Sequence, residues 1–290
     1  MDLLSGLEQF GIYAEQDDME IYADEKRKAG SVKKQETKEE KKVLTEVDYL
    51  FTKKINCTIC DREIYVRMVK GTKLKRMQPD FDLRPRFEGI DALKYDVFAC
   101  PYCGYAAMGR YFDHLTRGQI QLVKDNVCAN FRYASDDLPD VYTYEETVTR
   151  YKLALYSSIV KRARTSEKAY TCLKLAWLYR EMEQGESGKD AALKAEYKKL
   201  WERFYKEAYD GFQHAIVNED FPMCGMDTYT MDYLLAALGY YFKDYSYASR
   251  CISHILSSRT VGRRIKDKAL DLKEIIIADI KKSVANAAKK

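Results

Sequence analysis

The sequence predicts an α+β fold that is mostly α-helical, in which a small β-rich four-cysteine zinc ribbon is followed by helical hairpins. Two observations predict this fold class. Two C-x-x-C pairs lie in a stretch of β-forming, turn-rich sequence, and from about residue 104 onward apolar residues recur with helical spacing. A chain of 290 residues is long enough to bury one large core or two modest ones.

Composition and charge narrow the class of protein. With 46% hydrophobic and 32% charged residues, the chain has the composition of a folded globular protein. A net charge of +4 is too small to indicate nucleic-acid binding by bulk electrostatics. No apolar run approaches the roughly 20 residues that span a bilayer, and the acidic N-terminus lacks the basic region of a secretory signal. We therefore expect a cytoplasmic protein with reduced thiols and no membrane segment.

Two N-terminal segments differ in composition from the rest of the chain. Residues 1–24 form a short segment of apolar clusters among acidic residues. Residues 25–47 are dominated by charged side chains and contain no aromatic residue. Because burial cannot offset the entropy lost on ordering such a stretch, we expect a flexible charged linker there.

Residues 48–112 are expected to form the zinc-ribbon-like module. Two β-forming stretches are typical of strands: EIYVRMV (63–69) and KYDVFAC (94–100), the second of which leads into a cysteine pair. Between them lies KLKRMQPDFDLRPRFEGID (73–91), whose two prolines and glycine break any helix. Asp80 and Asp82 in this connection are paired acids that we expect to cap a turn rather than to act in acid–base chemistry.

Residues 113–290 are expected to form a helical domain. Six stretches carry apolar residues at helical spacing and are joined by short connections. Thr143 and Glu146 have the spacing of a capping box at the start of the first helix. The six predicted helices cover residues 143–163, 166–184, 189–220, 231–245, 246–258 and 263–284.

Small residues in these helices indicate a tetratricopeptide-like repeat, in which the two helices of a hairpin approach too closely for large side chains. Ala176 in one helix and Ala208 and Ala215 in the next have the expected mutual spacing, and Ala248 takes a corresponding place in a second unit. Relative to the usual unit of about 34 residues, about 20 residues are inserted around 184–204. The alternative is a generic helical bundle. The last helix, with its basic outer face, is expected to cap the stack.

The two C-x-x-C pairs, Cys57/Cys60 and Cys100/Cys103, are the strongest functional signal. A C-x-x-C turn presents two thiolates to one ion, and zinc binds four such ligands in a tetrahedron. A glycine follows the second pair and favours a left-handed turn, whereas the first pair lacks it. The pairs lie farther apart than the usual 15–20 residues of compact zinc sites, so we expect a long hairpin to bring them together. We predict one structural Zn²⁺ per chain.

Other interpretations of the cysteines remain open. A thioredoxin-like redox pair uses one motif at the start of a helix in a βαβ unit, and the thiols could also be buried by coincidence. A catalytic zinc is not expected, because four thiolates leave no open position for water. His114 lies near the second pair and is a weaker candidate ligand. The single cysteines are expected to be small buried hydrophobic residues: Cys128, Cys172, Cys224 and Cys251.

The segment YDVFACPYCGYAAMGRYF (95–112), with INCTIC (55–60) before it and LKLAWLYREM (173–182) after it, resembles a bacterial family catalogued only as domain of unknown function 2225. The resemblance covers about residues 48–280. It implies that the four paired cysteines are zinc ligands. The sequence departs from the family pattern at Asp61, where a glycine is customary. Because the family has no established activity, the resemblance implies an architecture and no function.

The leading functional hypothesis is an adaptor that binds a protein or peptide partner in a groove formed by the helical hairpins. No phosphate-binding loop, dinucleotide-binding motif or nucleophile elbow occurs, so no catalytic residue is predicted and an enzyme is only a third possibility. Candidate side chains for the groove, or for the core beneath it, are Tyr151, Tyr170, Trp177, Tyr179, Tyr233 and Tyr240.

The alternative hypothesis is nucleic-acid binding by the basic, aromatic-containing stretch between the cysteine pairs. These basic side chains could equally form a solvated face without a ligand. The identity of the partner and the oligomeric state are not predicted. The candidate nucleic-acid surface consists of Arg62, Arg67, Lys70, Lys73, Lys75 and Arg76.

Overall fold

The structure is a computed structural model that describes residues 44–132, 135, 137–185 and 190–287. Residues Leu44–Lys290 form one compact unit. The predicted acidic-apolar segment (1–24) and most of the predicted linker (25–47) lie outside the described residues. No described helix is both long enough and apolar enough to cross a membrane.

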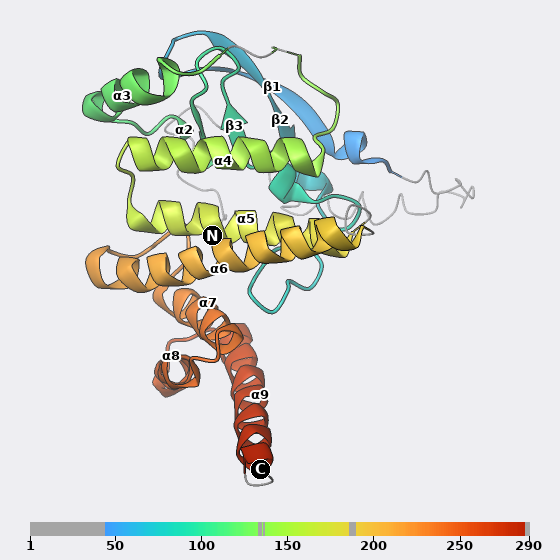
Figure 1. Cartoon of the computed structure of the whole chain (residues 1–290), viewed down its shortest axis with the longest axis vertical. Helices are drawn as coiled ribbons and strands as arrows, with labels where there is room; N and C mark the ends of the chain where they lie inside the picture. Colours follow the sequence, from blue (N-terminus) through green and yellow to red (C-terminus); the bar gives the residue numbers. More distant parts are fainter. Residues whose placement is uncertain (1–43, 133–134, 136, 186–189, 288–290) are drawn as a thin grey trace, which may run out of the picture. The chain divides into compact units, whose positions relative to one another are not determined.

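Two short antiparallel hairpins make up the β structure (Figure 1). Strand β1 (Leu50–Asn56) pairs with β2 (Glu63–Val69), and β3 (Val97–Ala99) pairs with β4 (Ala106–Met108). Each hairpin ends in a turn that contains one C-x-x-C pair. The expectation of one long hairpin joining the two pairs is therefore wrong. Each pair has a hairpin of its own, and the sequence between them follows a separate path.

The end of the predicted linker belongs to the folded unit. Residues 46–49 form the 3-10 helix η2, in which the Glu46 carboxylate accepts hydrogen bonds from Lys94 Nζ at 2.8 Å and from the Tyr95 hydroxyl at 2.8 Å. Lys94 and Tyr95 lie in a second 3-10 helix, η4 (Ala92–Tyr95). An isolated acid in a charged run gives no local signal that its partners lie almost fifty residues away.

Six long helices follow the hairpins and agree with the six that the periodicity predicts. The capping box is confirmed: Thr143 Oγ1 accepts from the Glu146 N–H at 3.1 Å, and the Glu146 carboxylate accepts from the Thr143 N–H at 2.8 Å. Two shorter helices and a π-helical turn precede them. In chain order the elements are α2 (Gly109–Phe112), α3 (Arg117–Val123), η5 (Lys124–Cys128), α4 (Tyr144–Val160), α5 (Thr165–Gln184), α6 (Ala191–Asn218), α7 (Thr228–Tyr241), α8 (Tyr245–Ser257) and α9 (Arg263–Ala287).

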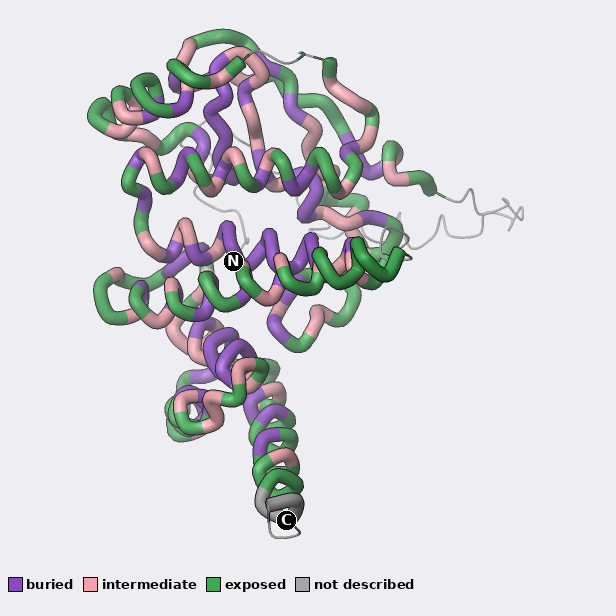
Figure 2. Tube along the Cα trace, in the orientation of Figure 1, coloured by how far each residue is buried: buried purple, intermediate pink, exposed green. Residues whose placement is uncertain are grey.

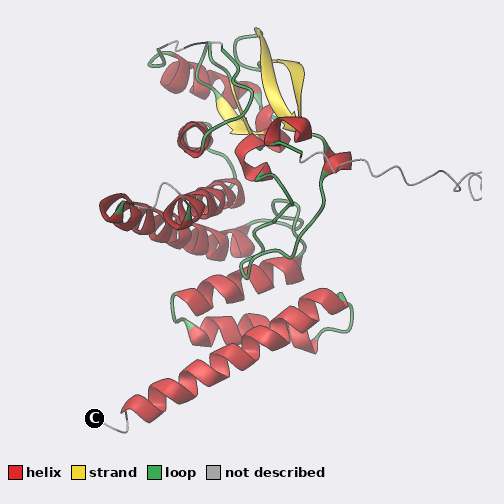
Figure 3. Ribbon diagram, turned by 90° about the vertical axis from the view of Figure 1, so that its right-hand side faces the viewer, coloured by secondary structure: helices red, strands yellow, loops and turns green. Residues whose placement is uncertain are grey.

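Within this unit the elements are stacked in layers. Helix α4 lies between the hairpins and the α5–α6 pair, and α7, α8 and α9 form a layer on the other side of that pair (Figures 1 and 3). Helices α5 and α6 approach each other closely. A Cβ built on Gly211 of α6 would lie only 2.8 Å from the Ala169 Cβ of α5. Consecutive helices thus pack as hairpins, while their identity as a tetratricopeptide-like repeat stays a prediction.

The largest apolar cluster, here called the main core, crosses the boundary expected at residue 112/113. It joins Leu93, Val97 and Met108 from the hairpin region to side chains of α4 through α9. Figure 2 shows α5 and α7 buried along much of their length. The β3–β4 hairpin and the helices therefore share a core within the described chain, whereas the buried residues of β1 and β2 lie in two smaller clusters.

Candidate metal centre

The first cysteine turn, residues 57–62, is closed by two backbone hydrogen bonds. The Cys57 N–H donates to the Arg62 carbonyl at 2.9 Å, and the Asp61 N–H donates to the Cys57 carbonyl at 2.9 Å. Asp61 has a φ of 58°, in the left-handed region that aspartate tolerates better than most side chains. The aspartate at the position of the family's glycine thus adopts the backbone conformation that a glycine would supply.

The second turn, residues 100–105, repeats this pattern. The Cys100 N–H donates to the Tyr105 carbonyl at 2.8 Å, and the Gly104 N–H donates to the Cys100 carbonyl at 3.0 Å. Gly104 has a φ of 75°. A Cβ at this position would lie 2.3 Å from the ring of Phe131, so the glycine meets both a conformational and a steric requirement.

The two turns bring four sulfur atoms together. Cys57 Sγ lies 3.7 Å from Cys103 Sγ, Cys60 Sγ lies 3.6 Å from Cys100 Sγ, and all four sulfurs are within 4.8 Å of one another. A tetrahedron with metal–sulfur bonds of about 2.3 Å has sulfur–sulfur edges of about 3.8 Å. A disulfide needs a separation of about 2.05 Å, and all four cysteines are free. The arrangement can hold one metal ion, and its size and ligand type suit zinc.

Hydrogen bonds within the cluster link the pKa values of three of its thiols. Hydrogen bonds from Cys103 and Cys57 lower the pKa of Cys100, and the hydrogen bond to Cys100 raises the pKa values of Cys57 and Cys103. The protons on the neighbouring thiols thus stabilise one thiolate. A divalent ion stabilises four thiolates at once, so its binding releases the remaining protons.

The surroundings of the sulfurs favour a closed structural site. Cys57, Cys100 and Cys103 are buried and Cys60 is half-buried. The cluster packs among apolar side chains of β2, α2, α3 and η5. Four thiolates complete the coordination of zinc without a water molecule, so this centre can hold structure together but offers no site for hydrolytic chemistry.

A fifth thiol lies at the edge of the cluster. Cys128, in η5, is half-buried and packs against the cluster, and burial raises its pKa. No local pattern distinguishes it from the other single cysteines, because its proximity to the cluster depends on how α3 and η5 fold back. The other three are buried, and burial raises their pKa values as expected for unreactive thiols: Cys172, Cys224 and Cys251.

His114 does not belong to the cluster. The ligand atoms that gather are those of the four paired cysteines, within the part of the chain that the structure describes. His114 instead lines a separate cavity with Arg110 and Lys161.

The candidate nucleic-acid residues are dispersed, and most have a partner. Arg67 pairs with Asp140 at 2.8 Å, and Lys75 pairs with Glu88 at 2.6 Å. The Arg62 guanidinium lies over an aromatic ring, and Lys70 and Lys73 both donate to one backbone carbonyl. Arg76 is exposed.

The six candidate groove aromatics lie mainly in the core. Tyr151, Trp177, Tyr179 and Tyr233 are buried in the main core, so they are not accessible to a partner in this conformation. Three of them use their polar atoms internally: the Tyr151 and Tyr233 hydroxyls donate to backbone carbonyls at 3.1 Å, and Trp177 Nε1 donates to Asp82 at 2.8 Å. The remaining two are half-buried and pack against the same core: Tyr170 and Tyr240.

A buried ionic network has a role that sequence reasoning missed. Asp82, only 1% exposed, accepts hydrogen bonds from Trp177 Nε1 at 2.8 Å, from Arg180 Nη1 at 2.8 Å and from the Tyr205 hydroxyl at 2.9 Å. Burial opposes its ionisation, but Arg180 and the other donors outweigh this and lower the pKa of Asp82. The expected turn-capping acid therefore attaches the connection between the cysteine pairs to α5 and α6.

Two neighbouring residues strengthen the same attachment. Arg84 is completely buried, donates to the Trp177 carbonyl at 2.8 Å and pairs with Asp91 at 2.7 Å. Arg86 pairs with both Asp80 and Glu181. The acids around these two arginines neutralise their charge.

An open groove of about 620 Å³ lies over α5, between α4 and α6. Its walls include Leu155 and Ile159 from α4 and Leu200 and Phe204 from α6. Its floor includes Ala169 and its neighbours on α5. We call this surface the α5 groove. None of the six aromatics proposed for a groove lines it.

Comparison with known families gives one match. A family described as "Uncharacterized protein conserved in bacteria (DUF2225)" matches residues 50–276, which include both cysteine turns and most of the helical region. Comparisons with curated proteins and with solved structures give no match.

Proposed function

The chain belongs to the DUF2225 family of uncharacterised bacterial proteins, and from that premise we propose that it is a zinc-binding adaptor that holds a peptide segment of a protein partner in the α5 groove. The zinc ion would stabilise the hairpin region. The helical hairpins would provide the binding surface.

The observation that carries this proposal is the apolar character of an accessible groove. Ile159 on one wall is 55% exposed, an unusual state for a large apolar side chain at the edge of a cavity. Leu155, Leu200 and Phe204 are half-buried beside it. Apolar side chains of a peptide could complete their burial, and this is the usual way in which a helical groove recognises an amphipathic segment.

Charges in the groove favour a segment that is also acidic. Lys168 and Arg203 line it, and neither has a carboxylate within 4 Å among the residues described. Glu207 is the acid in the groove that is not in an ion pair, since Asp210 pairs with Lys206 at 2.5 Å. The net excess of basic charge suits an amphipathic peptide with acidic residues along the border of its apolar face.

Site-specific crosslinking tests the groove directly. We would place the photoreactive amino acid p-benzoylphenylalanine at position 159 and, as a matched control, at position 217, where Val217 of α6 is 79% exposed and lies outside the groove. The proposal predicts that one bacterial protein crosslinks through residue 159 and not through residue 217. Equal crosslinking from both positions would contradict it.

The captured peptide then provides a quantitative test. Phe204→Asp should weaken binding of the synthetic peptide by at least about tenfold, because a charge would replace an apolar contact in the groove. Val217→Asp should leave the affinity unchanged. Far-ultraviolet circular dichroism and thermal unfolding would verify that both variants are folded. Equal affinity of the Phe204→Asp variant and the parent protein would refute a role for the groove.

The structure offers less support for nucleic-acid binding. Arg67 and Lys75 are in ion pairs, and Arg84 and Arg86 lie in the internal network. Fluorescence anisotropy with labelled single-stranded oligonucleotides tests the nucleic-acid-binding hypothesis. Phosphate contacts would make the affinity fall steeply as salt concentration rises.

A further inference from the structure

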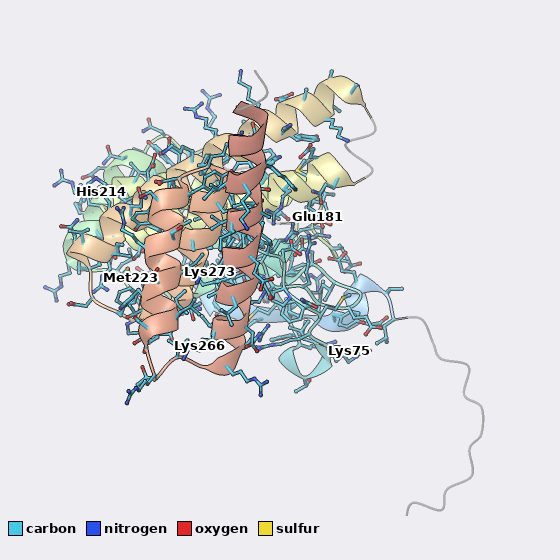
Figure 4. The ribbon with its side chains drawn as sticks, turned by 90° about the horizontal axis from the view of Figure 1, so that it is seen from below. Lys75, Glu181, His214, Met223, Lys266 and Lys273 are labelled. Carbon is cyan, nitrogen blue, oxygen red and sulfur yellow. The ribbon has the colours of Figure 1, made fainter. Side chains whose placement is uncertain are left out.

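A second cavity, of about 550 Å³, lies between the connection 76–87 and helices α5, α7 and α9. We call it the α9 pocket. In Figure 4 helix α9 crosses the front of the molecule, and the segment that carries Lys75 lies to its right. The volume is within the range of about 300–1,000 Å³ that is typical of small-molecule sites.

The interior of the α9 pocket is mostly apolar. Leu173 and Trp177 of α5, Leu234 of α7 and Ile265 of α9 contribute to its lining, and Phe87 adds an aromatic ring from the connection. Such a lining can bury the aromatic or aliphatic part of a ligand, but it does not determine how the ligand is oriented.

The polar side chains that line the α9 pocket are predominantly basic. Arg76, Arg264 and Lys268 come from two separate segments, and none has a carboxylate within 4 Å in the described part of the chain. Asp82 and Arg86 also line the pocket, but their charges are balanced by partners in the buried network. The pocket therefore carries about three uncompensated positive charges.

Lys268 is only partly stabilised by its surroundings, which include the Tyr233 ring and the nearby Asp271 carboxylate. Its ammonium group lies over the Tyr233 ring, 5.6 Å from the ring centroid. Burial and the nearby Arg264 lower the pKa of Lys268. An anion placed between the two cations would relieve this repulsion.

Basic groups in two other cavities have internal partners. In the cavity that contains His114, Lys161 pairs with Glu167 at 2.8 Å and Arg110 donates to the Cys224 carbonyl. In the cavity beside β1 and β2, Lys174 pairs with Asp96. The α9 pocket thus combines an apolar interior with basic groups that lack such partners.

From this combination we propose that the α9 pocket binds a small molecule that has an apolar body and an anionic group. The body would lie against the half-buried side chains of Phe87 and Ile265. The anionic group would lie toward Arg264 and Lys268, with Arg76 on the opposite border. The proposal is independent of the adaptor function, because no residue lines both this pocket and the α5 groove.

The dye 8-anilinonaphthalene-1-sulfonate is a suitable probe, because it joins an aromatic body to one sulfonate. N-phenyl-1-naphthylamine has the same body without the charge and serves as the matched ligand control. The chain has two tryptophans, so a Trp201→Phe background leaves Trp177 as the sole indole reporter in the pocket. Dye bound in the pocket should quench its emission by energy transfer.

We expect the sulfonate dye to bind with an affinity that falls as salt concentration rises. The double variant Arg264→Gln/Lys268→Gln should weaken this binding by about tenfold, as expected for the loss of two partly screened charge interactions. Binding of the uncharged dye should not change. Arg263→Gln is the matched protein control, because Arg263 is 95% exposed and lies outside the pocket.

Four results would overturn the proposal. They are no detectable binding of the sulfonate dye, equal affinity for the charged and uncharged dyes, an equal loss of affinity in the Arg263→Gln control, and dye binding that leaves the emission of Trp177 unchanged. Thermal unfolding of each variant separates a local loss of charge from a loss of fold.

Discussion

Positions 61 and 104 occupy the same place in the two cysteine turns, immediately after the second cysteine of each pair. Both residues have positive φ, but one is an aspartate with an exposed side chain and the other a glycine packed against Phe131. The local requirement is a left-handed backbone. The additional steric requirement is found only at Gly104.

This difference predicts unequal effects of substitution. Gly104→Ala should lower the thermal midpoint and weaken zinc binding for two reasons. The new Cβ would collide with the Phe131 ring. An alanine in the left-handed region also costs about 1–2 kcal/mol. Asp61→Gly should change stability by less than about 1 kcal/mol. Thermal unfolding and competition with a colorimetric zinc chelator measure both effects. A larger loss in Asp61→Gly than in Gly104→Ala would contradict the account of the turns.

Asp82 gives a second prediction for a single residue. Asp82→Asn should destabilise the protein by up to about 3–5 kcal/mol, because the half-buried Arg180 guanidinium loses its nearer counter-charge and keeps only Asp80 at 3.2 Å. Urea unfolding at pH 7 measures the loss. Asp80→Asn is the control and should have a smaller effect, since Asp80 is more exposed and Arg180 keeps its contact with Asp82.

The same carboxylate should contribute to the pH dependence of stability. Because the folded pKa of Asp82 is lowered, its ionised form stabilises the fold above the unfolded pKa of about 3.9. This contribution is lost as the pH falls from there through the lower folded pKa. The Asp82→Asn variant should therefore lose less free energy of unfolding than the parent protein between about pH 4 and pH 2.5. Parallel pH profiles of the two proteins would exclude this contribution.

Single residues also show what sequence could and could not predict about the site. The four ligand cysteines were predictable, because each pair has its own local spacing. Arg84 is not distinguished by any local sequence pattern, yet it is completely buried and donates to the carbonyl of Trp177, 93 positions away. Such long-range partners leave no local pattern, so the network could be found only in the folded chain.

At the scale of secondary structure, local periodicity accounts for most of the agreement. The helices α4 to α9 and the strands β2 and β3 coincide with stretches whose spacing or composition predicts them. Strand β1 was not predicted, because its burial pattern shows almost no alternation of buried and exposed residues. The path of the connection between the hairpins was also not predicted, since tertiary ion pairs determine it.

The close approach of α5 and α6 leads to a prediction for helical packing. Alanine normally stabilises a helix by about 1 kcal/mol relative to glycine. Gly211→Ala should nevertheless destabilise this protein, because its Cβ would lie 2.8 Å from that of Ala169. Gly118→Ala on α3 should be stabilising, since nothing lies within 4 Å of its built Cβ.

Urea unfolding of both glycine variants measures the difference in sign. Ala169→Gly should restore part of the stability lost in Gly211→Ala, and a double-mutant cycle would give the coupling free energy. An increase in stability in both glycine variants would show that α5 and α6 are not in close contact at this point.

At the scale of the folded unit, the metal centre and the helices are connected through a shared core. Val97 and Met108 belong to the hairpin that carries Cys100 and Cys103, and both pack in the main core with α4. Loss of zinc should therefore affect helix α4 as well as the cysteine turns. The sequence suggested two regions because the periodicity changes near residue 112, but periodicity does not report which side chains share a core.

Hydrogen exchange after zinc removal tests this connection. Chelation should lower the protection of α4 amides by at least about tenfold, while amides of α9, which lies in the layer farthest from the hairpins, should change much less. Uniform loss of protection would indicate global unfolding. Loss confined to the cysteine turns would show that the main core does not transmit the effect.

The central claim concerns four thiolates that bind one zinc ion. The most direct test is zinc K-edge X-ray absorption spectroscopy, combined with metal analysis of the purified full-length protein. We predict one zinc per chain and four sulfur neighbours at about 2.3 Å. A folded protein without stoichiometric metal, or a zinc ion whose neighbours are nitrogen and oxygen, would contradict the claim.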